Sequence, residues 1–284
     1  MSWHYVQDIM GSRKITCTSE ETIDKLAYAV KHAINISPEL LRKTKEYIIG
    51  KHYLTYKVMR LLKEHHLKNI DSITKKIVKN SKIMHLLSTI DNYDEKLLKH
   101  SFNTAAYALV IGSAIEYKNL NELFIGAVLH DTGKLLTSKK ILNKSATLTK
   151  KEQLIIQKHP ADGHHLICKI GIAKPKSAIA LMAYQHHERE DGKGYPQLLV
   201  GKEMTKAAKI VGISDVIEAM SERTVYQKST MHLDEICIFL EIYSGIKTSR
   251  RTNKRIADLK KVYKNRRLFD PKIVKPFVKY VRAM

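Results

Sequence analysis

The spacing of apolar residues is the feature that most constrains how this chain can fold. Apolar side chains recur three and four positions apart through nearly the whole sequence, and strong alternating strand patterns are missing. With 284 residues, the chain can also bury a large hydrophobic core. The sequence therefore predicts an all-α fold, arranged as one large domain or as two ordinary ones.

Helix signals divide the chain into two parts. Residues 1–92 predict several polar and basic helices, one of which begins after Ser19. The pair Asp91-Asn92 marks a predicted helix boundary, and the helices that carry candidate functional residues follow it. We therefore expect an N-terminal helical domain of unknown role over residues 1–92 and a second domain over residues 93–284.

Two local signals predict helix ends in the second domain. Gly133 is a stop signal for the apolar helix in the stretch NELFIGAVLHDTGK, and Thr149 is a predicted N-cap for the next helix. We expect that helix to end before Pro160. These ends place several polar residues close to the termini of apolar helices.

A set of imidazole and carboxylate side chains could carry chemistry, because each belongs to a largely apolar stretch. The candidates are His100, His130, Asp131, His159, His186, His187 and Asp215. Such donors, without thiolates, suit divalent iron, manganese or zinc. Seven ligands are too many for one tetrahedral ion but enough for two, with Asp131 bridging. Two ions roughly 3.5–4 Å apart can activate water and hold a phosphoryl group.

Each candidate also has a purely structural interpretation. A single buried histidine such as His100 is more often a hydrogen-bonded core residue than a ligand. A histidine late in a helix, such as His130, is favourable there without any metal, and Asp215 could face solvent. The pairs His65-His66 and His164-His165 are interpreted as surface or packing residues, so two adjacent histidines are weak evidence. The order of the motifs around them favours the metal hypothesis.

The motifs HDTGK, HHE and DGKGYP, in this order, resemble the signature of the HD-GYP proteins, a branch of the HD-domain metal-dependent phosphohydrolases. The resemblance runs from about His100 to the end of the chain. It includes ILNK at 141–144, KHP at 158–160, SDV at 214–216 and FDP at 269–271. It implies an all-α HD-domain helical bundle that hydrolyses cyclic di-GMP to pGpG or GMP, with two divalent metal ions. Iron is the first expectation for these ions, and manganese is the second.

The resemblance also implies roles for individual residues. One ion would be held by His100, His130, Asp131 and Asp215, and the other by Asp131, His159, His186 and His187. Lys134 and Asp131 would be catalytic, with Lys134 meeting the scissile phosphate as a point charge. The remaining predicted substrate-binding residues are Gly192, Gly194, Tyr195, Pro196, Glu218, Arg223 and Lys228.

The sequence departs from the family pattern at several positions. Lys96 stands where some family members have a third-metal glutamate, and Lys209 stands where the family usually has arginine. Thr224 occupies the position of a substrate-side arginine. Arg223 is one residue away, which is a rotation of about 100° on a helix, so Lys228 would compensate only in part. These departures leave open an alternative, a non-catalytic or weakly active HD-GYP protein that acts as a cyclic dinucleotide or protein-interaction module.

The charge balance adds a third hypothesis. The chain has 50 Lys and Arg residues against 28 Asp and Glu residues, a formal net charge of +22. Such a surplus attracts polyanions, so a nucleic acid partner stays open, as does a protein partner of the N-terminal domain. The basic run at 246–267 fits either a solvated face or a docking surface. A strong salt dependence of polynucleotide binding would support a phosphohydrolase that acts on nucleic acid. The oligomeric state stays open.

The remaining sequence signals concern the cellular compartment. No run of eighteen apolar residues predicts a membrane span, and the first residues lack a signal-peptide pattern. Cys17, Cys168 and Cys237 are far apart and form no CxxC motif, which is typical of reduced thiols. We therefore expect a cytoplasmic protein.

Overall fold

The computed structural model describes residues 18–34, 36–222, 230–248, 254–263 and 266–284. Two predicted substrate-binding residues, Arg223 and Lys228, lie outside the described residues. Every regular element within the described ranges is helical, apart from an isolated bridge between Asp191 and Val200. The predicted all-α class is therefore confirmed.

The structure comprises the following helices in the described ranges. They are α1 (Glu20–Lys31), α2 (Pro38–Ile49), α3 (Tyr56–Met59), α4 (Glu64–Lys79), α5 (Ser81–Tyr93), α6 (Glu95–Ala114), α7 (Leu120–Leu129), η2 (Thr132–Leu136), α8 (Lys139–Leu142), α9 (Lys150–Ile156), α10 (His159–Ile170), α11 (Ala178–Gln185), η3 (Gly201–Glu203), α12 (Lys206–Ser221), α13 (Leu233–Tyr243), α14 (Lys254–Tyr263) and α15 (Pro271–Arg282). None of them is both long and apolar enough to cross a membrane.

Local sequence signals account for several helix starts. The helix predicted after Ser19 begins at Glu20, and Thr149 caps α9 as predicted. The Glu152 backbone N–H donates to the Thr149 hydroxyl at 3.3 Å, and the Thr149 N–H donates to the Glu152 carboxylate at 2.7 Å. This reciprocal pair satisfies backbone donors that a helix start otherwise leaves free.

The helix boundary predicted at Asp91-Asn92 lies slightly later in the structure. Helix α5 runs to Tyr93, and the Asp94 carboxylate caps α6 by accepting a hydrogen bond from the Lys96 N–H at 2.9 Å. The capping carboxylate decides the position, because it satisfies a backbone donor in the first turn of α6.

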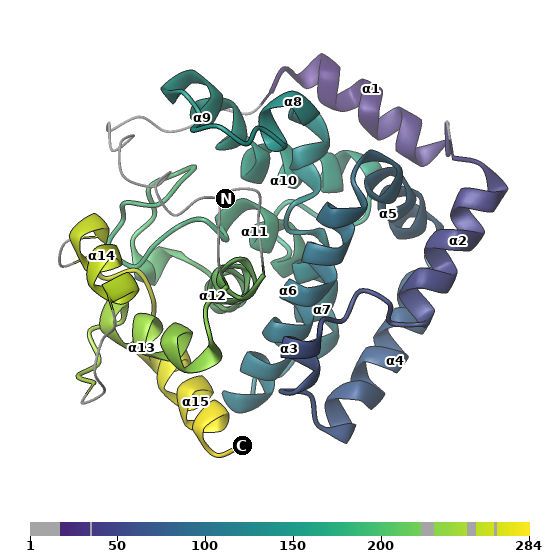
Figure 1. The fold of residues 1–284 in the computed structure, drawn as a ribbon. Coiled ribbons are helices and arrows are strands. Elements are labelled where there is room, and N and C mark those ends of the chain that lie inside the picture. Colours follow the sequence, from purple (N-terminus) through teal and green to yellow (C-terminus); the bar gives the residue numbers. More distant parts are fainter. Residues whose placement is uncertain (1–17, 35, 223–229, 249–253, 264–265) are drawn as a thin grey trace.

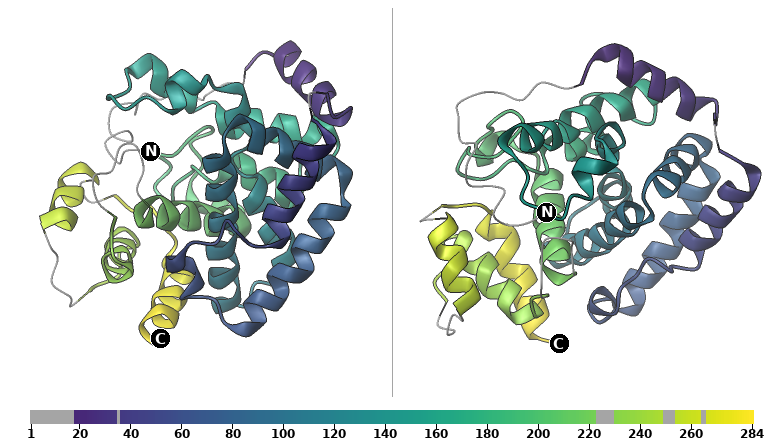
Figure 2. Two further views of the ribbon diagram at one scale, coloured as in Figure 1. Left: turned by 45° about the vertical axis from the view of Figure 1, so that its right-hand side comes forward. Right: turned by 45° about the horizontal axis from the view of Figure 1, so that its top comes forward.

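Helix α6 lies at the centre of the molecule, beside α7 and α12 (Figure 1). Helices α1, α2, α4 and α5 lie on one side of it, and α13, α14 and α15 lie on the other (Figures 1 and 2). All residues from Ser101 through Gly112 are buried, so α6 is enclosed around its whole circumference. This central helix carries His100 near its N-terminal end.

The N-terminal helices share a hydrophobic core with the rest of the chain. Helix α1 packs on α10, and α5 packs on α6. Ile70 and Leu87 from the N-terminal part belong to the same core cluster as Phe102 and Ile217. The division into residues 1–92 and 93–284 stays a prediction.

Candidate metal centre

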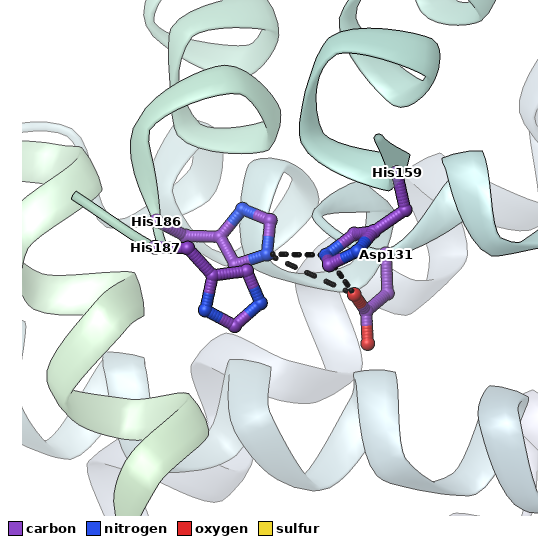
Figure 3. Close-up of side chains that lie close together, drawn as sticks. All are labelled: Asp131, His159, His186 and His187. Atoms are coloured by element: carbon purple, nitrogen blue, oxygen red, sulfur yellow. Dashed lines mark hydrogen bonds and ion pairs between the residues drawn. The ribbon is translucent and has the colours of Figure 1, made fainter. Parts of the chain in front are cut away.

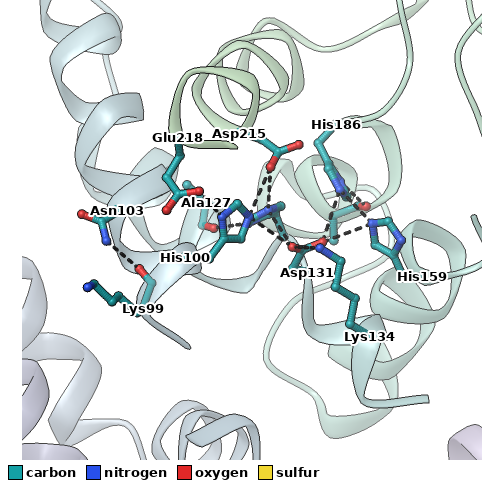
Figure 4. A network of polar contacts seen from close by, with 12 residues as sticks. Lys99, His100, Asn103, Ala127, Asp131, Lys134, His159, His186, Asp215 and Glu218 are labelled. Carbon is teal, nitrogen blue, oxygen red and sulfur yellow. Dashed lines mark hydrogen bonds and ion pairs between the residues drawn. The ribbon is translucent and has the colours of Figure 1, made fainter. Parts of the chain in front are cut away.

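All seven predicted ligand residues come together at one place in the fold. Figure 4 labels five of them, which are His100, Asp131, His159, His186 and Asp215. His130 caps the C-terminal end of α7 and His186 caps that of α11, and in each case the next predicted ligand follows directly. His159 is the first residue of α10. Five segments that are distant in sequence therefore converge, as they do where helical bundles build metal sites in their cores.

The side chains form two groups, each compact enough for a metal ion. Asp131, His159, His186 and His187 each offer a ligand atom within 4.8 Å of the others (Figure 3). Ligand atoms of a second group lie equally close together, and this group consists of His100, His130 and Asp215. Short distances between donor atoms of this type are what a bound cation requires.

Asp131 lies between the two groups, with one carboxylate oxygen facing each. Its Oδ1 atom is 3.1 Å from His159 Nε2 and 3.7 Å from His186 Nε2. Its Oδ2 atom is 3.3 Å from His100 Nε2 and 3.3 Å from His130 Nε2. The carboxylate is therefore placed to serve both groups at once.

Backbone carbonyl groups orient three of the imidazoles. In His130, His159 and His186, Nδ1 lies 2.6, 2.7 and 2.9 Å from the carbonyl oxygen three residues earlier and donates a hydrogen bond to it. With a proton on Nδ1, the neutral form of each ring directs its Nε2 lone pair toward the centre. The same arrangement orients histidine ligands in metalloproteins.

A carboxylate performs this task for His100. Glu218 Oε2 lies 2.5 Å from His100 Nδ1, which leaves His100 Nε2 facing Asp215 Oδ1 at 3.2 Å. Asp215 and Glu218 are one turn apart on α12, so one helix supplies both contacts. The sequence did not predict this contact of Glu218, and a direct role of Glu218 in substrate binding stays a prediction.

Several buried nitrogen and oxygen atoms that could bind a metal have no hydrogen-bond partner among the described residues. They are His100 Nε2, His130 Nε2, Asp131 Oδ1 and His187 Nε2. His159 Nε2 and His186 Nε2 also face each other at 3.2 Å, although the backbone contacts give both atoms lone pairs. Burying unsatisfied acceptors costs about 1–3 kcal/mol each. Cations would satisfy all of them, so the residues present fit a pair of divalent ions.

Electrostatics holds three of these side chains, Asp131, His186 and His187, in the form that binds metal. Burial alone would raise the pKa of Asp131, but His130 and Lys134 hold that pKa well below its usual range. Burial and neighbouring imidazoles hold the pKa of His186 and that of His187 well below their usual value. Near neutral pH, Asp131 is therefore ionised and both histidines are neutral, as metal ligation requires.

Gly133 brings Asp131 and His159 together and does not end α7. The helix ends earlier, at Leu129, and Gly133 lies inside η2, so the predicted stop is wrong. A Cβ atom on Gly133 would lie 2.0 Å from the His159 carbonyl oxygen and 2.5 Å from the Gly163 nitrogen. Only glycine permits this close approach of η2 to α10.

The glycine-rich loop lies directly against the histidine pair. The Tyr195 ring stacks on His187, with centroids 4.7 Å apart and an interplanar angle of 23°. Gly192 has a φ of 70°, which favours glycine. A Cβ atom on Gly194 would lie 2.4 Å from Glu188 Cα. The predicted loop, including Pro196, therefore borders the metal centre.

The structure adds residues that hold this loop, which sequence reasoning did not single out. The buried Glu188 carboxylate accepts hydrogen bonds from the Gln197 N–H at 2.6 Å and the Leu199 N–H at 3.0 Å. Arg189 donates to the His186 carbonyl oxygen at 2.9 Å. Glu188 and Arg189 directly follow the histidine pair in the sequence, and this position is the signal that could have identified them.

Two basic residues connect the loop region to the C-terminal part. Lys209 Nζ lies 2.8 Å from Glu190 Oε1 and 3.1 Å from Asp270 Oδ2. Arg266 contacts both oxygens of Asp191, at 2.7 and 3.0 Å. Lys209, one of the predicted departures from the family pattern, therefore still makes ion pairs at its position.

Lys134 lies at the edge of the candidate metal centre. Its Nζ atom contacts Asp131 Oδ2, and its side chain is 13% exposed. A largely buried ammonium group beside the bridging carboxylate can reach an anion that approaches the same place.

Known proteins resemble this chain in sequence and in fold. The pattern of the HD domain family matches residues 85–240, which is more than half of the chain. The chain is 31% identical over 157 residues to 3'3'-cGAMP-specific phosphodiesterase 1 of Vibrio cholerae, covering 54% of this chain and 35% of that protein. It is 26% identical over 161 residues to a cyclic di-GMP phosphodiesterase of Pseudomonas aeruginosa, covering 56% and 38%. The chain thus spans about a third of the length of these relatives.

A solved structure shares the overall fold. The HDG"Y"P protein Bd1817 from Bdellovibrio bacteriovorus matches 98% of this chain and 76% of its own, with a TM-score of 0.50 and 14% identity. The predicted resemblance to HD-GYP proteins is confirmed by these matches together. Since the family pattern covers more than half of the sequence, including every candidate ligand, the chain belongs to the HD domain family.

Proposed function

We propose that this chain is a metal-dependent phosphodiesterase that hydrolyses cyclic di-GMP to pGpG or GMP. The observation that carries the proposal is the position of Asp131, whose two oxygens each face one group of imidazole nitrogens. A carboxylate in that position can bridge two metal ions, and a bridged pair is suited to phosphoryl chemistry.

The proposed ligands follow from the two groups. His100, His130, Asp131 and Asp215 would hold one ion, and Asp131, His159, His186 and His187 would hold the other. Imidazole and carboxylate donors suit iron or manganese, and we propose iron first. When bound, the two ions would supply an activated water and stabilise charge on the phosphoryl oxygens.

Lys134 would act on the phosphate directly. Its ammonium group contacts Asp131 Oδ2 and is therefore within reach of a phosphoryl oxygen beside that carboxylate. As negative charge develops on the oxygen, a fixed positive charge in a partly buried site stabilises it. Tyr195, stacked on His187, would border the substrate from the side of the loop.

The names of the relatives support a cyclic dinucleotide as the substrate. One relative is named for cyclic di-GMP and another for 3'3'-cGAMP. The second name makes 3'3'-cGAMP an alternative substrate that must be tested beside cyclic di-GMP, because the relative that bears it is the more similar in sequence of the two. A cytoplasmic location stays part of the proposal.

The test is metal analysis and product chromatography on one purified sample. The protein, loaded anaerobically with Fe(II) or with Mn(II), is incubated separately with cyclic di-GMP and with 3'3'-cGAMP. We expect about two equivalents of metal and either a linear dinucleotide or its mononucleotides as the product. Opening of 3'3'-cGAMP alone would reassign the substrate.

Two other results would replace the proposal. Calorimetric binding of a cyclic dinucleotide without turnover would favour the non-catalytic module. Turnover of polynucleotides, with binding that weakens steeply as salt increases, would favour a phosphohydrolase that acts on nucleic acid.

A further inference from the structure

The segment between α2 and α3 is bound to α6 one turn beyond His100. Asn103, which is fully buried, donates through Nδ2 to the Tyr53 carbonyl oxygen at 2.7 Å. The Thr55 N–H donates back to Asn103 Oδ1 at 3.0 Å. Because both halves of one amide side chain bind backbone groups, this segment has a defined position against α6.

Helix α3, which directly follows this segment, contacts the end of α12. Lys57 Nζ donates a hydrogen bond to the Ser221 carbonyl oxygen in the last turn of that helix. A cation is favourable there, because the final carbonyl groups lack helical partners and carry partial negative charge. Ser221 is three residues beyond Glu218, which contacts His100. The N-terminal part therefore contacts both helices that carry this pair, α6 through Asn103 and α12 through Lys57.

Other N-terminal contacts reach the elements of the second ligand group. The Tyr93 hydroxyl, at the end of α5, donates to the Thr137 carbonyl oxygen directly after η2. The Thr18 N–H and hydroxyl donate to the Asp162 carboxylate at 2.5 and 2.7 Å. Asp162 lies one turn beyond His159 on α10. The contacts thus reach both ligand groups.

We propose that residues 18–93 position the metal centre, and that Lys57 is a positioning residue for its His100 side. Ligands on separate helices must keep their geometry to within about 0.5 Å. The N-terminal contacts lie within about one turn of His100, Glu218 and His159, so they restrain the helix segments on which that geometry depends. The inference rests on the proposed metal binding and adds a role for the N-terminal helices.

The shared core argues against an N-terminal part that moves independently. Relative motion is expected between domains that meet at a small polar interface, but not where the interface is large and apolar. Here the fully buried Tyr53 packs against Phe102 of α6, with ring centroids 4.3 Å apart and an interplanar angle of 32°. Rearranging this contact would expose aromatic surface. It would also break the hydrogen bonds between the Asn103 side chain and the backbone of Tyr53 and Thr55.

The test uses Lys57→Met in the full chain, which removes the charge and keeps most of the apolar stem. Mn²⁺ binding is measured by equilibrium dialysis, and the ring nitrogen signals of His100 are followed by NMR in metal-free protein. We expect one of two ions to bind about tenfold more weakly, as when outer contacts of a ligand are lost, and the His100 signals to shift. Lys57→Arg should restore both, because it can still donate to the Ser221 carbonyl oxygen.

Lys68→Met is the matched control. Lys68 belongs to the same N-terminal part, pairs with Glu64 at 2.7 Å, and has a side chain that is 75% exposed. The Lys68→Met substitution should leave metal binding and the His100 signals unchanged. Tyr93→Phe is a second variant, which removes the hydroxyl that reaches Thr137 and should also weaken one ion.

The outcomes separate the inference from the proposed function. Unchanged metal affinity and unchanged His100 signals in Lys57→Met would overturn the positioning role, and so would a lower melting temperature as the sole effect. Equal losses in Lys68→Met would overturn it as well. If wild-type protein binds no metal, the proposed function fails, while the His100 signals still decide whether Lys57 positions that side chain.

Discussion

Glu218 Oε2 accepts a hydrogen bond from His100 Nδ1 at 2.5 Å, although 118 residues separate the two in sequence. The contact fixes the proton of His100 on the side away from the candidate metal. Glu218→Gln keeps an acceptor but loses the charge, so the imidazole becomes a weaker ligand. We expect Mn²⁺ affinity to fall about tenfold to a hundredfold in calorimetric titrations. Glu122→Gln, at a partly exposed position in the first turn of α7, is the control, and equal affinity in both variants would contradict the role of Glu218.

Asp131 is the residue whose loss should affect both ions. Asp131→Ala removes the two oxygens that face the two ligand groups, and His130→Ala removes a ligand of one group. We expect both variants to lose more than about a hundredfold in turnover, with metal content lowest in Asp131→Ala by elemental analysis. His164→Gln, which lies outside both groups, should behave like wild type. Full activity and two bound ions in Asp131→Ala would refute the ligand assignment.

Lys134 should separate catalysis from metal binding. Lys134→Ala removes the charge beside Asp131 Oδ2 but no metal ligand. We expect the metal content to stay unchanged and kcat to fall about a hundredfold to a thousandfold, as when a stabilising donor is removed. Steady-state kinetics and elemental analysis on one preparation measure both quantities. If the variant loses metal but keeps the same turnover rate for each protein molecule that holds two metal ions, Lys134 has only a structural role.

Gly194 should tolerate no side chain. A Cβ atom there would lie 2.4 Å from Glu188 Cα and 2.5 Å from the Arg189 nitrogen, and backbone atoms cannot move aside independently. We expect Gly194→Ala to lower the free energy of unfolding by about 1–3 kcal/mol, measured by urea denaturation. Lys193→Ala, at an exposed position in the same loop, should change it little. Equal stability of the two variants would mean that the loop approaches the histidine pair less closely.

His66 should make the folded protein sensitive to acid. Burial, together with His65 and Lys63, lowers the pKa of His66 from 6.5 to about 4. Between these values the unfolded chain binds the proton and the folded chain does not, so stability falls as the pH falls through this window. His66→Gln keeps a side-chain acceptor for the Lys63 N–H that His66 Nδ1 binds at 3.0 Å.

The measurement for His66→Gln is the melting temperature in chelator at several pH values between about 7 and about 5. We expect a smaller decrease toward acid than in wild type. The exposed His52→Gln should decrease as wild type does. A decrease in His66→Gln that parallels wild type would show that His66 does not contribute.

Individual residues show which features of the fold and of the candidate site could be predicted from the sequence. The all-α fold and the cap at Thr149 depend on residues close together in the chain, so periodicity and capping chemistry predicted them. The prediction of a helix stop at Gly133 is wrong, because this glycine is required by a carbonyl group 26 residues away on α10. Local sequence contains no trace of such an approach.

The sequence by itself determined the helical fold and the chemical type of the candidate ligands, because helix periodicity and side-chain donors are properties of short segments. Only the tertiary structure decided that Asp131 faces two groups of nitrogen atoms, that Glu218 supports His100, and that the N-terminal helices contact the elements around them. These relationships join residues that are far apart in the chain. They arise from how the helices pack around α6, which the order of residues along each helix does not specify.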